Sequence, residues 1–129
     1  MRGLISGLDP AGPYFRGMPD HVKLDASDAA FVDIIHTMGK PSLGRSLGNE
    51  EAVGHLDFYP NGGEKQPGCG FELEQDTISY EIFATVGCSH SRAYELFSDS
   101  LVSSCSTVSY ECESYESFEK VRFFEIVLK

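Results

Sequence analysis

A short segment of the chain has a pattern that can position a nucleophilic serine. Gly44-Arg45-Ser46-Leu47-Gly48 fits G-x-S-x-G, in which the serine occupies a sharp turn between a strand and a helix and attacks an acyl carbon. The flanking residues do not fit that context, because Pro41-Ser42-Leu43 stands where a strand is needed and Asn49-Glu50-Glu51 is a short polar sequel. We therefore predict that Ser46 is not a nucleophile.

Two other residues have the types and positions of an acid and base pair. Asp9 follows directly after a predicted strand, where open α/β sheets place reactive groups, and His90 stands at the start of a predicted helix. A carboxylate beside an imidazole fixes its tautomer and stabilises the imidazolium formed in general base catalysis. The alternative interpretation is that Asp9 caps a turn and His90 packs against a neighbouring element.

Short apolar segments would have to position these residues. Apolar and β-branched runs that end at Pro, Gly or Asn predict strands over residues 3–8, 30–37 and 54–59, and a last strand over 121–128. Long loops separate these segments. Strands with sparse helix and loops of ten or more residues predict part of an α/β sheet.

One helix is predicted, beginning after Ser89 as its N-cap. The spacing of its apolar face places these residues together: His90, Tyr94, Phe97 and Leu101. The remaining segments lack a clear period. We therefore predict loops over residues 11–23 and 70–87 and an irregular acidic segment over 110–116.

The composition limits the kinds of partner that this chain can have. Its 129 residues suffice for one domain or part of one, and 10 Lys and Arg against 20 Asp and Glu give a net charge of -10. Negative charge repels phosphate backbones, so we expect no nucleic-acid partner. The sequence has no run approaching the roughly 20 apolar residues of a membrane span, and the segment after Met1 is too short for a signal-peptide core.

The cysteines and the remaining histidines do not have the spacing of a metal site. Cys69, Cys88, Cys105 and Cys112 form no C-x-x-C pair and no spaced Cys/His set, so disulfides in an oxidising compartment are the better interpretation. The other histidines are expected to be exposed or to pack against strands: His21, His36 and His55.

Five segments occur in a characteristic order along the chain. They are Gly7-Leu8-Asp9-Pro10-Ala11-Gly12-Pro13-Tyr14-Phe15, Phe31-Val32-Asp33-Ile34-Ile35-His36-Thr37, Gly54-His55-Leu56-Asp57-Phe58-Tyr59-Pro60-Asn61-Gly62-Gly63, Pro67-Gly68-Cys69 and Cys88-Ser89-His90-Ser91-Arg92-Ala93-Tyr94. Together they closely resemble the pancreatic-lipase-like family of secreted animal lipases and phospholipases A1, over about residues 3–117. The resemblance implies that residues 1–129 are a partial lipase domain with an α/β-hydrolase fold. It would comprise the C-terminal strands, a lid loop and the helix of the catalytic histidine, without the nucleophile elbow.

The resemblance assigns catalytic roles to Asp9 and His90. Asp9 matches the triad acid and His90 the triad base, and the family's chain order of Ser, Asp and His places the nucleophile upstream of Asp9. Ser46 therefore has the wrong position as well as the wrong surroundings. Without the serine and the oxyanion-hole donors, we expect the isolated chain to have no serine-esterase activity.

A structural calcium site is also implied by the resemblance. The matching loop implicates the side chains of Asp20, Asp25 and Asp28 and the backbone carbonyl of Lys23, which are hard oxygen ligands. Asp20 and Lys23 stand where the family has Glu and Arg, so we expect an altered site, and a solvated acidic turn is the alternative. No other cofactor is expected.

Cys69 and Cys88 are implied to form the disulfide that closes the lid. Apolar side chains inside this loop would face the acyl-binding cleft when the lid is shut, or simply pack on the sheet: Phe71, Leu73, Ile78, Tyr80, Ile82 and Phe83. Cys112 either pairs with Cys105 or stays free, because the later cysteine with which relatives pair it is absent.

These expectations describe part of an extracellular carboxylic-ester hydrolase that cleaves triacylglycerols or phospholipids at a lipid interface. The short lid favours phospholipids. The chain would also expose the sheet edge where the upstream part of its own domain belongs. The alternative is a non-catalytic lipase-like module that binds or stores lipid, but the presence of both Asp9 and His90 favours the enzyme.

Overall fold

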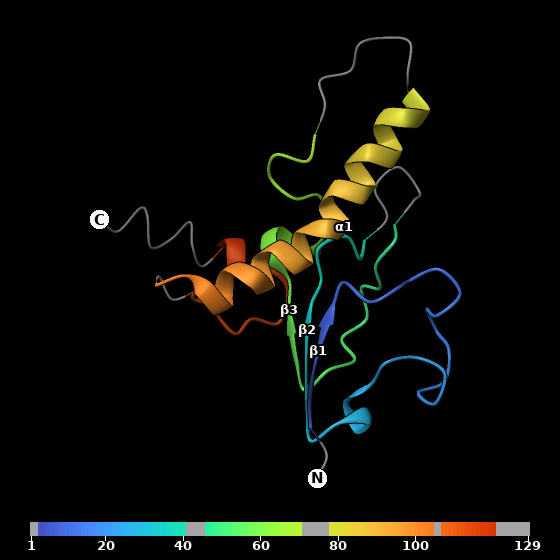
Figure 1. Cartoon of the computed structure of the whole chain (residues 1–129), viewed down its shortest axis with the longest axis vertical. Helices are drawn as coiled ribbons and strands as arrows, with labels where there is room; N and C mark the ends of the chain where they lie inside the picture. The colour runs from blue at the N-terminus through green and yellow to red at the C-terminus, as the bar shows by residue number, and fades with distance from the viewer. Residues whose placement is uncertain (1–2, 41–45, 71–77, 105–106, 121–129) are drawn as a thin grey trace.

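Three parallel strands form the sheet of this protein. The computed structural model describes residues 3–40, 46–70, 78–104 and 107–120. Strands β1 (Leu4–Leu8), β2 (Phe31–Ile35) and β3 (Leu56–Phe58) lie side by side in the order β1-β2-β3 (Figure 1). The strands predicted in the first 60 residues are thus confirmed with shorter bounds, and the one predicted over 121–128 lies outside the described residues.

The alternation of β2 defines the core. Val32 and Ile34 are fully buried and pack with Ala29, whereas Phe31 on the other face is 37% exposed. Leu24 and Val53 from the flanking loops cover the same apolar cluster. The two faces of the strand therefore differ, although its sequence is nearly continuously apolar.

Helix α1 (Ile78–Val102) lies across the carboxyl ends of the strands, as Figure 1 shows. The predicted loop over 70–87 is therefore wrong from Ile78 onward, and Ser89 lies inside the helix instead of capping it. The buried face carries Val86, Ser89 and Ala93. The predicted face is wrong too: Tyr94 is 55% exposed and Leu101 is 70% exposed.

Short helical turns complete the described structure. The segment η1 (Ala26–Asp28) precedes β2, and η2 (Pro60–Gly63) follows β3 with left-handed φ angles of 80° at Gly62 and 70° at Gly63. Residues 115–120 are also helical, so the irregular segment predicted over 110–116 is confirmed for 110–114 and corrected at Tyr115 and Glu116. The Tyr115 ring lies against Gly62, where a Cβ would come within 3.0 Å of it.

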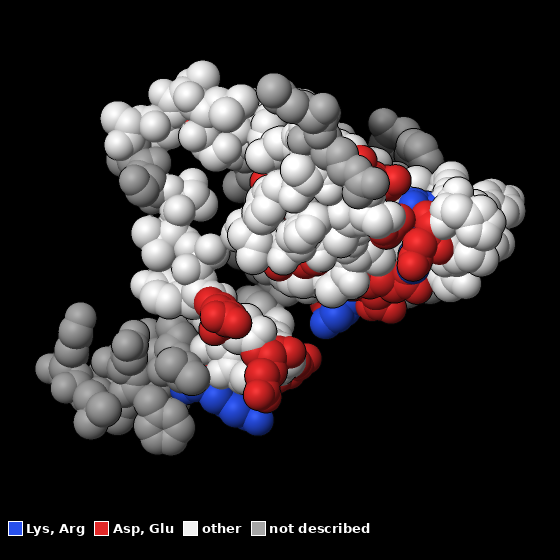
Figure 2. All heavy atoms as spheres, turned by 90° about the horizontal axis from the view of Figure 1, so that it is seen from below, with Lys and Arg blue, Asp and Glu red and all other residues white. Residues whose placement is uncertain are grey.

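Acidic side chains outnumber basic ones on the face of the molecule seen in Figure 2, in keeping with the net charge of -10. Among the described residues, we find no helix with the length and apolar character needed to cross a membrane.

Candidate active site

Asp9 is held in one orientation by the backbone around it. It follows β1 with a φ of 46°, in the left-handed region that Asp tolerates better than most residues, and its amide donates to the carbonyl of Ile35 at 2.8 Å. The carboxylate is buried, and its Oδ1 accepts hydrogen bonds from the amides of Thr37 at 2.9 Å and Met38 at 3.0 Å. Amide donors of this kind stabilise the ionised carboxylate.

His90 completes the pair from the middle of α1. Its Nδ1 lies 2.6 Å from Oδ2 of Asp9, across 81 residues of sequence. Because an ionised carboxylate only accepts, Nδ1 carries the proton and the neutral ring has its lone pair on Nε2. The hydrogen bond to Asp9 is the main cause that raises the pKa of His90 above 6.5, its ordinary value, and burial of the ring opposes the rise.

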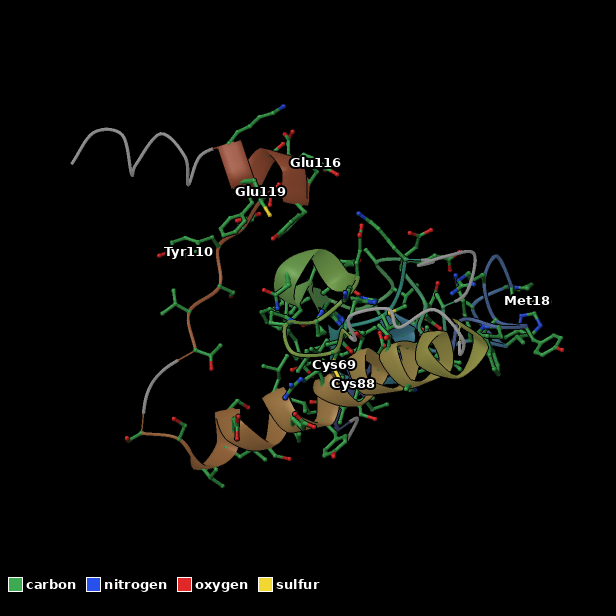
Figure 3. All side chains as sticks on the ribbon, turned by 90° about the horizontal axis from the view of Figure 1, so that it is seen from above. Met18, Cys69, Cys88, Tyr110, Glu116 and Glu119 are labelled. Carbon is green, nitrogen blue, oxygen red and sulfur yellow. A yellow bond between two sulfur atoms is a disulfide. The ribbon has the colours of Figure 1, made fainter. Side chains whose placement is uncertain are left out.

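The segment that contains Gln66 and Cys69 fastens α1 beside Asp9. Cys69 and Cys88 form a disulfide with a Cα separation of 5.5 Å, which confirms the predicted pairing (Figure 3). Ser89 is buried and its hydroxyl accepts a hydrogen bond from the amide of Gln66 at 3.1 Å. Three contacts within a few residues therefore fix the turn of α1 that carries His90, since Thr37 Oγ1 also donates to the carbonyl of His90 at 3.3 Å.

Gln66 is a positioning residue that sequence reasoning missed. Its buried side-chain amide donates to the carbonyls of Thr37 at 3.1 Å and Pro60 at 2.9 Å. Gln66 thus connects three parts of the structure: η2, the turn at Thr37 that holds Asp9, and the segment bound to α1. A polar residue directly before Pro-Gly-Cys gave no periodic signal, so only the three-dimensional contacts show this role.

Ser46, which we predicted not to be a nucleophile, makes contacts within its own loop and with Arg16. Its hydroxyl is buried, lies 2.8 Å from the carbonyl of Gly39 and 2.9 Å from that of Gly48, and accepts a hydrogen bond from Arg16. Gly44 and Arg45 lie outside the described residues. The last residue of the motif approaches the acid, because a Cβ at Gly48 would overlap the carboxylate of Asp9.

Two of the predicted calcium ligands, Asp25 and Asp28, have other partners in this structure. Asp25 accepts a hydrogen bond from the amide of Ser27 at 2.6 Å, and Asp28 accepts one from the amide of Asp25 at 3.1 Å, so the two form a capping box. Lys23 binds Glu51 at 2.6 Å through its ammonium group. Among the described residues, no group of three or more His, Cys, Asp or Glu side chains could hold a metal. Calcium binding through Asp20, Lys23, Asp25 and Asp28 therefore remains a prediction.

Several other expectations lie beyond the described part. The side chains of Phe71, Leu73, Ile78, Tyr80, Ile82 and Phe83 and the position of Cys105 are outside the described residues.

Cys112 is free and exposed. His55 is exposed as predicted, with its Nδ1 accepting a hydrogen bond from the amide of Val32 at 3.0 Å.

A buried carboxylate bonded to imidazole Nδ1, at the carboxyl end of a parallel sheet, is the acid and base arrangement of serine hydrolases. The family model described as "Lipase" matches residues 2–127, so this chain belongs to the lipase family. The match supports the pancreatic-lipase-like resemblance. Family membership implies the α/β-hydrolase fold, of which the parallel sheet and α1 are consistent with a part.

Similar proteins include pancreatic lipases and related proteins. The chain is 44% identical to human pancreatic lipase-related protein 2 over 95% of its own length and 27% of the relative's. It is 41% identical to human pancreatic lipase-related protein 3 over 91% of its length, and 41% identical to rabbit (Oryctolagus cuniculus) pancreatic triacylglycerol lipase over 95%. The chain thus spans about a quarter of the length of these curated relatives, between 27% and 28%.

Proposed function

We propose that this chain supplies the acid and base of a lipase-type carboxylic-ester hydrolase. Asp9 acts as the triad acid and His90 as the base. The observation that carries the proposal is the 2.6 Å contact between Asp9 Oδ2 and His90 Nδ1, made by a carboxylate that two backbone amides already orient. The nucleophilic serine comes from a part of the lipase domain outside these residues, because the Ser46 hydroxyl is bound by Arg16.

The proposed reaction uses the free nitrogen of His90. Nε2 removes the proton from the serine hydroxyl as the serine oxygen bonds to the acyl carbon. The imidazolium then gives that proton to the alcohol oxygen as the ester bond breaks, leaving an acyl-enzyme. In the second half of the reaction, Nε2 of His90 removes a proton from a water molecule as the water oxygen bonds to the acyl carbon. The imidazolium then returns that proton to the serine oxygen as the fatty acid leaves. Asp9 stays ionised throughout and stabilises the imidazolium through Nδ1.

The proposed substrates are acyl esters of triacylglycerols or phospholipids presented at a lipid interface. The family supports this class, and the disulfide between Cys69 and Cys88 supports an extracellular location, because disulfides persist in oxidising compartments. We further propose that the segment closed by this disulfide acts as a lid. The phospholipid preference and the calcium site are finer expectations that the same family resemblance supports.

The proposal can be tested in a hybrid enzyme. Residues 2–127 would replace the matching segment of rabbit pancreatic triacylglycerol lipase, and hydrolysis of a short-chain triacylglycerol and of phosphatidylcholine would be measured. We expect the hybrid to hydrolyse ester and His90→Gln to lower kcat by about a thousandfold or more. His55→Gln, at an exposed histidine directly before β3, is the matched control.

Either of two results would contradict the proposal. One is full activity in the folded His90→Gln hybrid. The other is a folded hybrid with no more activity than that variant.

A further inference from the structure

A second histidine and aspartate pair lies beside the turn that holds Asp9. His36 follows β2 and is fully buried, and its Nε2 lies 2.8 Å from Oδ1 of Asp57 in β3. Its Nδ1 lies 2.7 Å from the carbonyl oxygen of Asn49, and the ring of Tyr59 stacks on it with a centroid separation of 4.4 Å. Two other segments of the chain, one at Asn49 and one from Asp57 to Tyr59, therefore fix this ring.

The partners of His36 determine its protonation state. The carbonyl of Asn49 can only accept, so Nδ1 must donate. Asp57 also accepts hydrogen bonds at both oxygens, from the amides of Val53 at 3.2 Å and Gly54 at 3.1 Å, which marks it as ionised. Nε2 must therefore donate as well. Both ring nitrogens of His36 thus face hydrogen-bond acceptors, which is the arrangement that a doubly protonated ring beside an ionised Asp57 would require.

The His36 ring is linked both to the amides that bind the Asp9 carboxylate and to the residue after Asp9. Thr37 and Met38, the two residues after His36, direct their amides at Oδ1 of Asp9. Asn49, whose carbonyl His36 binds, donates its own amide to the carbonyl of Pro10 at 2.7 Å. A displaced His36 ring would therefore move both the donors to the acid and the residue that follows it.

We infer that His36 and Asp57 are positioning residues that hold Asp9 in the orientation in which its carboxylate meets Nδ1 of His90. The catalytic meaning of this inference rests on the proposed function, but the geometry is independent of hydrolysis. A histidine that only fills space would need no second proton.

Among the described residues, Asp57 and Tyr59 are titratable groups that contact the His36 ring. Asp57 does so through a hydrogen bond and Tyr59 through stacking. Burial raises the pKa of Tyr59 to about 12, with smaller contributions from the charges of Asp57 and Glu50. The phenol therefore stays neutral near neutral pH. Of these two groups, only Asp57 can balance a positive charge on His36.

The protonation state can be read directly in the full chain. Nitrogen and proton NMR of the histidine rings at about pH 7.5, where an ordinary histidine is mostly neutral, would report protons on Nδ1 and Nε2. We expect both His36 nitrogens to be protonated. A single proton on the His36 ring would overturn the ion pair.

The positioning role can be tested by the titration of His90 in variants. His36→Gln removes the ring that contacts both Asn49 and Asp57. Asp57→Asn removes the charge of the Asp57 side chain with little change of its shape. We expect the His90 titration midpoint to fall by roughly half a pH unit or more in each variant. An opposite charge nearby shifts a pKa by about one to three units, and both variants would loosen the contact of the Asp9 carboxylate with His90. His55→Gln is the matched control and should leave the midpoint unchanged.

The inference would be overturned by a variant that is folded, as judged by circular dichroism, and that keeps the wild-type His90 midpoint. If His36→Gln does not fold, the result for Asp57→Asn decides, and if neither folds, the ring protons of the wild-type chain decide. None of these measurements requires hydrolysis, so failure of the proposed function would leave them interpretable.

Discussion

At the scale of single residues, the orientation of Asp9 depends on features that lie far apart in the chain. The left-handed φ of 46° turns its side chain away from β1, and the amides of Thr37 and Met38 receive it. The close approach of Gly48 leaves no room for another side chain at the carboxylate. The fold itself therefore holds the Asp9 carboxylate in place, and in the proposed triad this preorganisation would avoid a reorganisation cost.

The Asp9 and His90 pair predicts how stability depends on pH. Because the folded pKa of His90 is raised, the pair stabilises the fold fully below about pH 6.5, and this contribution is lost as the pH rises through the folded pKa. We expect Asp9→Asn to remove this dependence, since asparagine keeps the amide hydrogen bonds but not the charge. Urea unfolding at about pH 6 and about pH 8.5 would measure it. If the free energy of unfolding changed equally with pH in the wild type and in Asp9→Asn, the prediction would be wrong. The control His55→Gln should behave as the wild type.

The contact between Asp9 and His90 was predictable because both residues sit in sequence motifs. Asp9 and His90 were found through the segments that resemble lipases, and the lipase family assignment is confirmed. His36 and Asp57 were missed as a pair. They lie on neighbouring strands 21 residues apart, and their contact depends on the sheet register, which pairs Ile34 with Asp57.

At the scale of elements, α1 is the part that sequence patterns described least well. Gly87 and Cys88 interrupt the apolar spacing, and the buried face carries Ser89, which a helix pattern reads as polar. Ser89 is buried because its hydroxyl satisfies the amide of Gln66. Tertiary contacts of this kind override local periodicity and local capping signals.

The disulfide should be the main covalent support of this helix. We expect the double replacement Cys69→Ser and Cys88→Ser to lower the free energy of unfolding by about 3 kcal/mol, because the bond closes a loop of 19 residues. Cys112→Ser is the control, since Cys112 is free and exposed. Chemical denaturation of the three proteins provides the comparison. Equal stability of the double variant and the control would show that noncovalent contacts alone hold α1.

At the scale of the whole molecule, the described sheet has apolar and polar groups without partners. Leu4 on β1 is 65% exposed, and Leu56 on β3 is 51% exposed. Asp33 Oδ1 in β2 is buried and has no hydrogen-bond partner among the described residues. A buried oxygen without a donor is costly, and open sheet edges recruit further strands. These features fit a chain that spans 27% of the length of human pancreatic lipase-related protein 2.

We predict that the isolated chain self-associates through β1. Leu4→Lys should reduce this association, because a charged side chain on an edge strand opposes pairing with another strand. Sedimentation velocity over a range of concentrations would measure it, with Val22→Lys, at a loop residue that is 46% exposed, as the matched control. A wild-type chain that stays monomeric throughout the range would show the prediction to be wrong.

The 81 residues between Asp9 and His90 also have a consequence for the order of folding. Contacts this distant form only after nearer ones have reduced the conformational freedom of the chain. The parallel pairing of β1 with β2 must come first, because it creates the turn whose amides receive Asp9. Closure of the Cys69 and Cys88 loop then brings α1 to that turn. The acid and base should therefore meet among the last events of folding, so their hydrogen bond is a natural reporter of the completed chain.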